Sequence, residues 1–253
     1  MTRRKICAVL INRANYGRLK PVLRAIREHP HLALHLVVGS AMLLPRFGEA
    51  VDVVKADGFE ISARVNFVVE GQTPTTMAVS AGLGIVEMAT VFENLAPDIV
   101  LIVADRYDAL AAAVAASYMN IPLAHLQGGE VTGSIDESVR HAITRLAHIH
   151  FPATELSAKR LARMGELPET IHHVGCPSID LVQEAIRNPN GLERLLNEDL
   201  QYKFDMYTPY LLVLQHPVTT DYEAATHQIS ETLYAMLELR MPTIMLMPNV
   251  DAG

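Results

Sequence analysis

The run Asp98-Ile99-Val100-Leu101-Ile102-Val103 decides the fold of this 253-residue chain. Every residue after Asp98 is apolar, which is typical of a central strand in a parallel sheet, because such a strand is buried on both faces. The Ala-rich segment 107–119 follows at once and predicts a helix whose small side chains let it lie close to the sheet. Residues 122–126 form the next apolar run and predict the neighbouring strand.

Segments with strand and helix patterns alternate on both sides of this run. The expected strands are residues 5–11, 32–38, 59–65, 149–152 and 171–174, and the expected helices lie around 19–26, 49–55, 75–95, 136–147 and 155–164. Parallel strands need crossover connections, which helices usually supply. The alternation therefore predicts an α/β fold with a doubly wound parallel sheet.

The periodic pattern is lost between Arg187 and Thr208, where Asn188-Pro189-Asn190-Gly191 is a turn signal. We therefore expect an N-terminal Rossmann-like domain over 1–186, a linker over 187–208 and the start of a second α/β domain over 209–253. In that second part, residues 210–214, 222–239 and 243–247 predict a single β-α-β unit. One such unit cannot bury its own faces, so we expect the second domain to be incomplete.

Composition argues against several functional classes. The chain carries 28 acidic and 21 basic side chains, a net charge of −7, and no long basic run, so a broad nucleic-acid-binding face is not expected. Cys7 and Cys176 make no disulfide framework or zinc site, and we expect both to be buried in a reducing cytoplasm. The apolar runs are too short for a membrane span, and the histidines lack a matching ligand set for a metal. The sequence also lacks the glycine patterns of dinucleotide-binding and P-loop proteins.

Polar residues gather at the ends of the expected strands, where ligands bind in open parallel sheets. The motifs are Asn12-Arg13, Asp105-Arg106, His125-Leu126-Gln127-Gly128-Gly129-Glu130, Gln215-His216-Pro217 and Asn249-Val250-Asp251. Each also has a purely structural interpretation. Asp105 could cap a helix, Arg13 could be a solvated charge, Gly128-Gly129 a tight turn, Asp136 and Arg140 a surface ion pair, His216 a packed loop histidine and Asn249 a turn former.

Longer strings make the pattern specific. Asp105-Arg106-Tyr107-Asp108-Ala109-Leu110 and the segment from His125 through Gly128-Gly129-Glu130-Val131-Thr132-Gly133-Ser134-Ile135-Asp136 to Thr144 resemble the signature of the hydrolysing UDP-N-acetylglucosamine 2-epimerases. The similarity extends in order through Gly175-Cys176-Pro177-Ser178 and Leu214-Gln215-His216-Pro217 to Pro248-Asn249. The resemblance covers nearly the whole chain and is that of the N-terminal two-thirds of such an enzyme.

The resemblance implies a two-domain GT-B-like fold that binds a UDP-sugar and uses no cofactor or metal. It implies a homo-oligomer, either a dimer or a tetramer, with no nucleic-acid or membrane partner. In this family UDP-GlcNAc loses its C2 proton and UDP to give 2-acetamidoglucal, and water then adds to give N-acetylmannosamine. By resemblance, Asp105, Glu130, Asp136 and His216 are the candidate catalytic residues, and the candidate substrate-binding residues are Arg13, Arg106, Gln127, Arg140 and Asn249.

Two positions depart from the family pattern. Ala104 replaces the usual glycine before the Asp-Arg pair, and we expect it to be tolerated if its φ is negative. Gln127 stands where several relatives have a catalytic glutamate, and an amide cannot exchange a proton at neutral pH. Either Glu130 takes over that role, or Asp105 and Asp136 suffice, or the substrate is chemically altered.

Alternative functions remain open on the sequence alone. The same reaction on a UDP-2,4-diacetamido-2,4,6-trideoxyhexose is the nearest one. A non-hydrolysing epimerase, a retaining glycosyltransferase of the same fold and a non-catalytic UDP-sugar-binding fragment are the others.

Overall fold

The computed structural model describes residues 3–45, 48–71, 73–187, 205 and 207–248. The chain divides into two compact units, Met1–Ser178 and Ile179–Gly253, so the division falls inside a helix and before the expected linker. Residues 188–204 of that linker lie outside the described residues.

The first unit is built on a six-stranded parallel sheet with the strand order β3-β2-β1-β4-β5-β6. Its strands are β1 (Arg4–Leu10), β2 (Leu32–Gly39), β3 (Ala63–Val65), β4 (Ile99–Val103), β5 (Leu123–Leu126) and β6 (Ile149–Phe151). The chain builds outward from β1 to β3 and then returns to place β4 beside β1. The predicted doubly wound α/β fold is confirmed, and the strand order reverses between β1 and β4.

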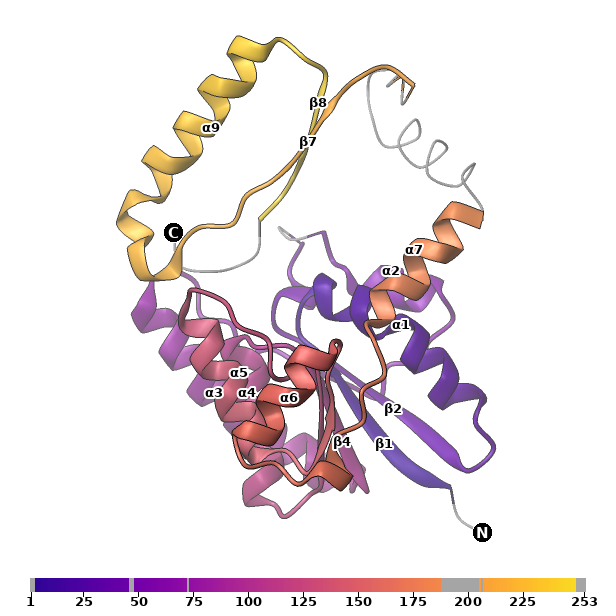
Figure 1. The fold of residues 1–253 in the computed structure, drawn as a ribbon. Coiled ribbons are helices and arrows are strands. Elements are labelled where there is room, and N and C mark those ends of the chain that lie inside the picture. Colours follow the sequence, from indigo (N-terminus) through magenta and orange to yellow (C-terminus); the bar gives the residue numbers. More distant parts are fainter. Residues whose placement is uncertain (1–2, 46–47, 72, 188–204, 206, 249–253) are drawn as a thin grey trace. The chain divides into compact units, whose positions relative to one another are not determined.

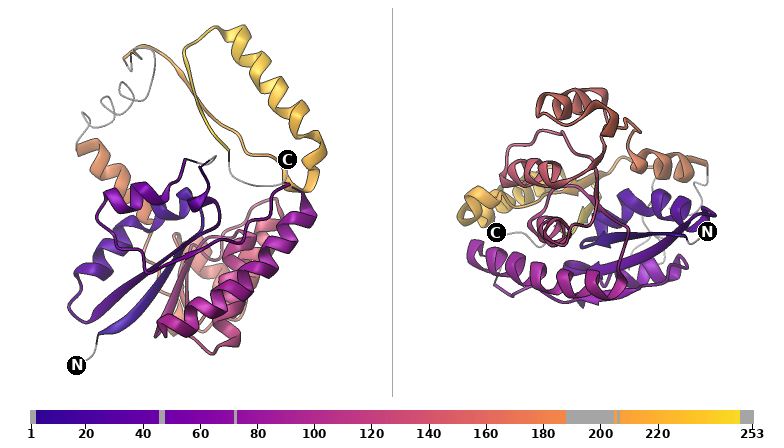
Figure 2. Two further views of the ribbon diagram at one scale, coloured as in Figure 1. Left: turned by 180° about the vertical axis from the view of Figure 1, so that it is seen from behind. Right: turned by 90° about the horizontal axis from the view of Figure 1, so that it is seen from below.

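Helices cover both faces of this sheet (Figures 1 and 2). On one face lie α3 (Pro74–Leu95), α4 (Tyr107–Tyr118) and α5 (Ile135–Leu146). On the other lie α1 (Arg13–Glu28), the short 3-10 helix η1 (Ser40–Leu43) and α2 (Val51–Ala56). The remaining helices of this unit are α6 (Glu155–Arg163) and η3 (Pro168–Thr170), and α7 (Pro177–Arg187) spans the division between the units.

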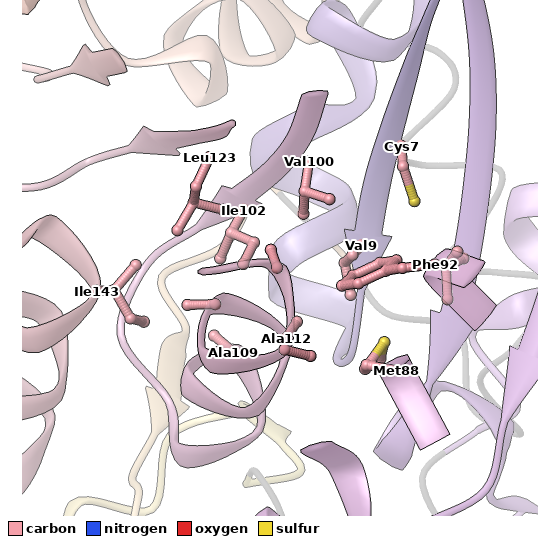
Figure 3. Packing of buried hydrophobic residues seen from close by; sticks show 14 of the residues in the cluster. Cys7, Val9, Met88, Phe92, Val100, Ile102, Ala109, Ala112, Leu123 and Ile143 are labelled. Atoms are coloured by element: carbon pink, nitrogen blue, oxygen red, sulfur yellow. The ribbon is translucent and has the colours of Figure 1, made fainter. Parts of the chain in front are cut away.

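The core side chains alternate between the two faces along each strand. Figure 3 shows the cluster in which Cys7 and Val9 of β1 and Val100 and Ile102 of β4 point towards α3, α4 and α5. The α4 helix packs closely because its buried positions are mostly alanine, and a Cβ added at Gly84 of α3 would lie 3.0 Å from Ala111. The small side chains of α4 therefore allow close packing against the neighbouring helix α3 as well as against the sheet.

Helix α3 is long and apolar enough, by length and composition alone, to cross a membrane. Its inward side chains Met88 and Phe92 are fully buried in the core of the first unit (Figure 3). The expectation that the apolar runs are too short for a span referred to uninterrupted runs, whereas Thr, Ser and Gly interrupt the apolar residues of α3.

The second unit contains a parallel pair of strands, β7 (Leu211–Leu214) and β8 (Thr243–Leu246), joined by η4 (Thr219–Ala224) and α9 (Ala225–Leu239). This is the predicted β-α-β unit. Among its described residues Leu212 and Leu214 are 64% and 52% exposed, which is the uncovered face expected of one isolated unit.

One predicted strand is wrong. Residues 171–174 form a single bridge, Ile171 with His150, and otherwise no ladder. The α7 helix, in contrast, was not expected. Pro177 at its first position and Ile179, Val182 and Ile186 at helical spacing are the signals that could have found it.

Candidate active site

The candidate site of the first unit lies where the strand order reverses, beyond the carboxyl ends of β1 and β4. In an open α/β sheet this is the point at which crossover helices diverge to opposite faces and leave a crevice for a ligand. The chain places Asn12-Arg13 after β1 and Ala104-Asp105-Arg106 after β4. The His125–Glu130 motif follows from β5, the strand next to β4.

A buried arginine holds this region together. Arg140 of α5 is 2% exposed, and its Nη2 makes an ion pair with the carboxylate of Asp105. Its Nη1 donates to the carbonyl oxygen of Glu130 at 2.9 Å and contacts the hydroxyl of Thr132 at 3.4 Å. One guanidinium therefore joins the end of β4 to the loop that follows β5.

This geometry removes two of the structural interpretations. Asp105 does not cap the Ala-rich helix, because the N-cap of α4 is Arg106 and no side chain caps it. Arg140 is not part of a surface ion pair, because it is buried and pairs with Asp105, which follows β4.

Asp136 lies in the first turn of α5, one turn before Arg140, and is half-buried. Residues four apart on a helix share a face, so Asp136 and Arg140 belong to the same side of α5. Ser134 caps the helix by accepting a hydrogen bond from the backbone nitrogen of Asp136. The cap fixes where α5 starts and therefore where both side chains leave the backbone.

The Gly128-Gly129 pair does more than form a turn. A Cβ on Gly129, whose φ is +79°, would lie 2.5 Å from the backbone oxygen of Ser157. Arg160 also donates to the Gly129 carbonyl oxygen at 3.1 Å. The loop therefore packs tightly against α6. This close packing fixes the backbone position of the next residue, Glu130, which is half-buried.

Gln127 is buried, and its side-chain amide donates to the sulfur of Cys176 at 3.2 Å. The expectation that both cysteines are buried is therefore wrong for Cys176, which is half-buried and accepts a hydrogen bond from Gln127. Cys7 is fully buried as expected, and burial raises the pKa of its thiol to about 12. The contact shows that Gln127 has a fixed neighbour other than a carboxylate.

A second buried polar cluster surrounds Arg106. The carboxylate of Asp108 is fully buried and accepts a hydrogen bond from the hydroxyl of Ser40 at 2.9 Å. The same carboxylate lies 3.4 Å from Nε of Arg106, which is itself 8% exposed. The cluster links the ends of β2 and β4. Arg106 was expected from the sequence as a site residue. Asp108 and Ser40 were not, although their polarity next to apolar neighbours was a signal.

Arg13 is exposed at the first position of α1. The preceding Asn12 forms a capping box with Asn15: each side chain accepts a hydrogen bond from the other's backbone nitrogen. The box orients the N-terminus of α1, and a helix N-terminus with a nearby arginine favours an anion.

His216 and Gln215 lie in the second unit, after β7. They line a hollow of about 230 Å³ with Thr226, Gln228 and Ile229 from the start of α9. His216 is exposed, so it is not the packed loop histidine of the structural interpretation. Asn249 lies outside the described residues. In the described part of the chain, no group of three or more His, Cys, Asp or Glu could hold a metal ion.

A family model described as UDP-N-acetylglucosamine 2-epimerase matches residues 24–253. The chain belongs to this family. It is 37% identical over 250 residues to a UDP-N,N'-diacetylbacillosamine 2-epimerase (hydrolyzing) of Legionella pneumophila and 30% identical to a UDP-N-acetylglucosamine 2-epimerase of Neisseria meningitidis. These matches cover 99% of this chain but 65% and 64% of the relatives, so the chain spans about two-thirds of their length.

Solved structures support the fold of this epimerase-family chain. The structure of the Neisseria meningitidis UDP-GlcNAc 2-epimerase bound to UDP-GlcNAc matches 97% of the chain with a TM-score of 0.80 at 16% identity, over 66% of its own length. The Methanocaldococcus jannaschii enzyme with UDP-GlcNAc and UDP matches with a TM-score of 0.76 at 18% identity, again over 97% of this chain and 66% of its own. The predicted GT-B-like fold is thus confirmed.

Proposed function

We propose that the protein is a hydrolysing 2-epimerase of a UDP-2-acetamido sugar, which releases UDP and the C2-epimerised free sugar. The observation that carries this proposal is the buried Arg140, which pairs with Asp105 and binds the Glu130 carbonyl at the point where the strand order reverses. This arrangement gathers the candidate acid-base residues of two strand ends around one fixed cation.

The first half of the proposed reaction is an elimination. A carboxylate accepts the C2 proton, the electrons of that C–H bond form the C1=C2 double bond, and UDP leaves with the electrons of the C1–O bond. Asp105 suits the base role, because it is a carboxylate whose position is fixed by the ion pair with Arg140. Arg106 and the N-terminus of α1 with Arg13 suit the stabilisation of the departing diphosphate.

The second half is an addition of water across the same double bond. Hydroxide joins C1 and a proton joins C2 on the face opposite to the one deprotonated, so one group must activate water and another must supply the proton. We assign this step to Asp136 and Glu130. Gln127 binds substrate by hydrogen bonding and does not exchange protons, since its side chain is an amide.

The Legionella relative favours a second candidate substrate. The chain shares 37% identity with that diacetylbacillosamine enzyme and 30% with the Neisseria UDP-GlcNAc enzyme. We therefore expect a higher kcat/KM on the UDP-2,4-diacetamido-2,4,6-trideoxyhexose than on UDP-GlcNAc. The protein is proposed to act in the cytoplasm as a homo-oligomer, dimer or tetramer, without cofactor, nucleic acid or membrane.

The test uses the protein expressed from its complete gene, incubated with each UDP-sugar in D₂O and followed by NMR. We expect free UDP and a free sugar that carries deuterium at C2. Asp105→Asn should lower kcat by ~100-fold or more, because the C2 proton then lacks its acceptor. Release of an epimerised UDP-sugar would instead indicate the non-hydrolysing reaction, and binding without turnover would indicate a UDP-sugar-binding module.

A further inference from the structure

His125 is a fully buried polar residue on β5 to which the proposed reaction assigns no role. Its Nε2 lies 2.8 Å from the carbonyl oxygen of Ala104, and its Nδ1 lies 3.2 Å from the hydroxyl of Thr144. The ring therefore bridges the end of β4 and helix α5, two elements that supply candidate catalytic groups.

The two contacts define the protonation of the ring. A carbonyl oxygen can only accept, so Nε2 carries the hydrogen, and Nδ1 of the neutral ring then accepts from the Thr144 hydroxyl. Burial, as the largest effect, lowers the pKa of His125 to about 4. The ring is thus neutral and has one fixed donor direction at physiological pH.

The carbonyl that His125 binds belongs to a strained residue. Ala104 has a φ of +69°, a left-handed conformation that favours glycine. The expectation that Ala104 tolerates its methyl group at negative φ therefore does not apply. Its backbone is held from both sides, because its nitrogen donates to the Leu126 oxygen at 3.2 Å and its oxygen accepts from His125.

This turn sets the direction of Asp105, which comes directly after Ala104. Arg140 and Thr144 are one turn apart on α5, so the same helix holds the turn twice. Arg140 binds the Asp105 carboxylate, and Thr144 orients the ring that binds the Ala104 carbonyl. Gly128 makes room for the second contact, since a Cβ there would lie 3.0 Å from the Thr144 hydroxyl and 3.1 Å from Nδ1 of His125.

We infer that His125 is a positioning residue, whose Nε2–H···O=C bond to Ala104 holds the left-handed turn that aims the Asp105 carboxylate. This inference rests on the proposed function for the role of Asp105, but not for the geometry of the turn. His125 itself is fully buried, so it acts through the backbone and not on the ligand.

The test compares His125→Gln with His125→Met in the protein expressed from its complete gene. The two side chains have similar length and neither titrates, but only glutamine offers an N–H near the position of Nε2. We expect His125→Gln to keep kcat within ~5-fold of wild type. His125→Met should lower kcat by ~30-fold or more, a loss typical of a misplaced catalytic group, with a smaller change in KM.

Both variants lose the bond from Thr144 to the ring, so Thr144→Val serves as a control for that contact. A crystal structure of His125→Met supplies a readout that is independent of activity. We expect the Ala104 turn to relax towards negative φ and the Asp105 carboxylate to move. Equal kcat values for the two variants, or an unchanged Ala104 turn in His125→Met, would overturn the inference. An inactive wild-type protein would count against the proposed function, whereas the crystal structure would still decide the positioning role.

Discussion

At the scale of single residues, the candidate site is marked by backbone conformations that side chains usually avoid. Ala104 and Gln127, each directly after a strand, have φ values of +69° and +62°. Such conformations cost on the order of 1–3 kcal/mol each and persist only where surrounding contacts fix them. Here those contacts are the His125 ring at the Ala104 oxygen and the Phe151 oxygen, which accepts from the backbone nitrogen of Gln127 at 3.0 Å. Both residues could be singled out from the sequence. Their strained φ values could not, because such a conformation depends on contacts from other elements.

Gly129 is the residue at which this packing is tightest. Gly129→Ala would set a methyl group against the Ser157 oxygen at positive φ, so we predict a loss of roughly 2 kcal/mol or more in the free energy of unfolding. Gly133→Ala in the same loop is the matched control, since nothing lies within 4 Å of its added Cβ. Urea unfolding followed by circular dichroism measures both. Similar midpoints for the two variants would contradict the assignment of Gly129 to close packing.

At the scale of elements, the contact of β5 with α5 through His125 should make the stability of the fold depend on pH, with a loss of stability in acid. His125 has a pKa of about 4 in the folded chain and about 6.5 when unfolded, because burial disfavours the charged ring. Between these values the unfolded chain binds a proton that the folded chain does not. The contribution of the neutral ring to stability is therefore complete above pH 6.5 and is lost as the pH falls towards 4.

His125→Gln isolates this effect, because glutamine does not titrate. Between pH 7 and pH 5 the wild type should lose about 2 kcal/mol more than the variant, at about 1.4 kcal/mol per pH unit below 6.5. His150 is buried beside Glu166 and has a lowered pKa too, but it is present in both proteins. Urea unfolding at the two pH values measures the difference. Equal losses in both proteins would show that residue 125 does not titrate between the folded and unfolded states.

The elements themselves were largely predictable, for physical reasons that differ along the chain. Central strands such as β4 are apolar on both faces, and α4 is rich in alanine, so local pattern sufficed. The strand predicted at 171–174 is wrong because only Ile171 pairs with the sheet, through a single bridge to His150, and no ladder follows. Helix α7 was missed although Pro177 at its first position and the helical spacing of its apolar residues were visible in the sequence.

The candidate site was predictable in its members but not in its bonds. The resemblance named Asp105, Gln127, Glu130 and Arg140, and the structure brings Arg140 to Asp105 and to the Glu130 backbone. It could not name His125, Thr144, Ser40 or Asp108 as their supports. Those residues act through contacts with residues far away in the sequence, and sequence spacing alone does not indicate which residues will meet.

At the scale of the whole molecule, the two units each present polar residues beyond the ends of parallel strands. The first offers Asp105 and Arg140, and the second offers His216 beside a hollow at the start of α9. We predict that His216 acts on the same UDP-sugar as Asp105, near the diphosphate. His216→Ala should then lower turnover by ~100-fold or more, in the range of a lost acid-base or electrostatic group.

The control for this change is His227→Ala, since His227 is an exposed histidine on α9 that does not line the hollow. Both residues are exposed, so neither substitution should shift the unfolding midpoint, and a loss confined to His216→Ala reports on function. The double variant Asp105→Asn, His216→Ala decides whether the two act together. Groups that serve one chemical step lose rate non-additively, so the double variant should be little slower than Asp105→Asn alone. Rate losses that multiply would show that the two residues contribute independently. Unchanged kcat and KM in His216→Ala would remove His216 from the reaction.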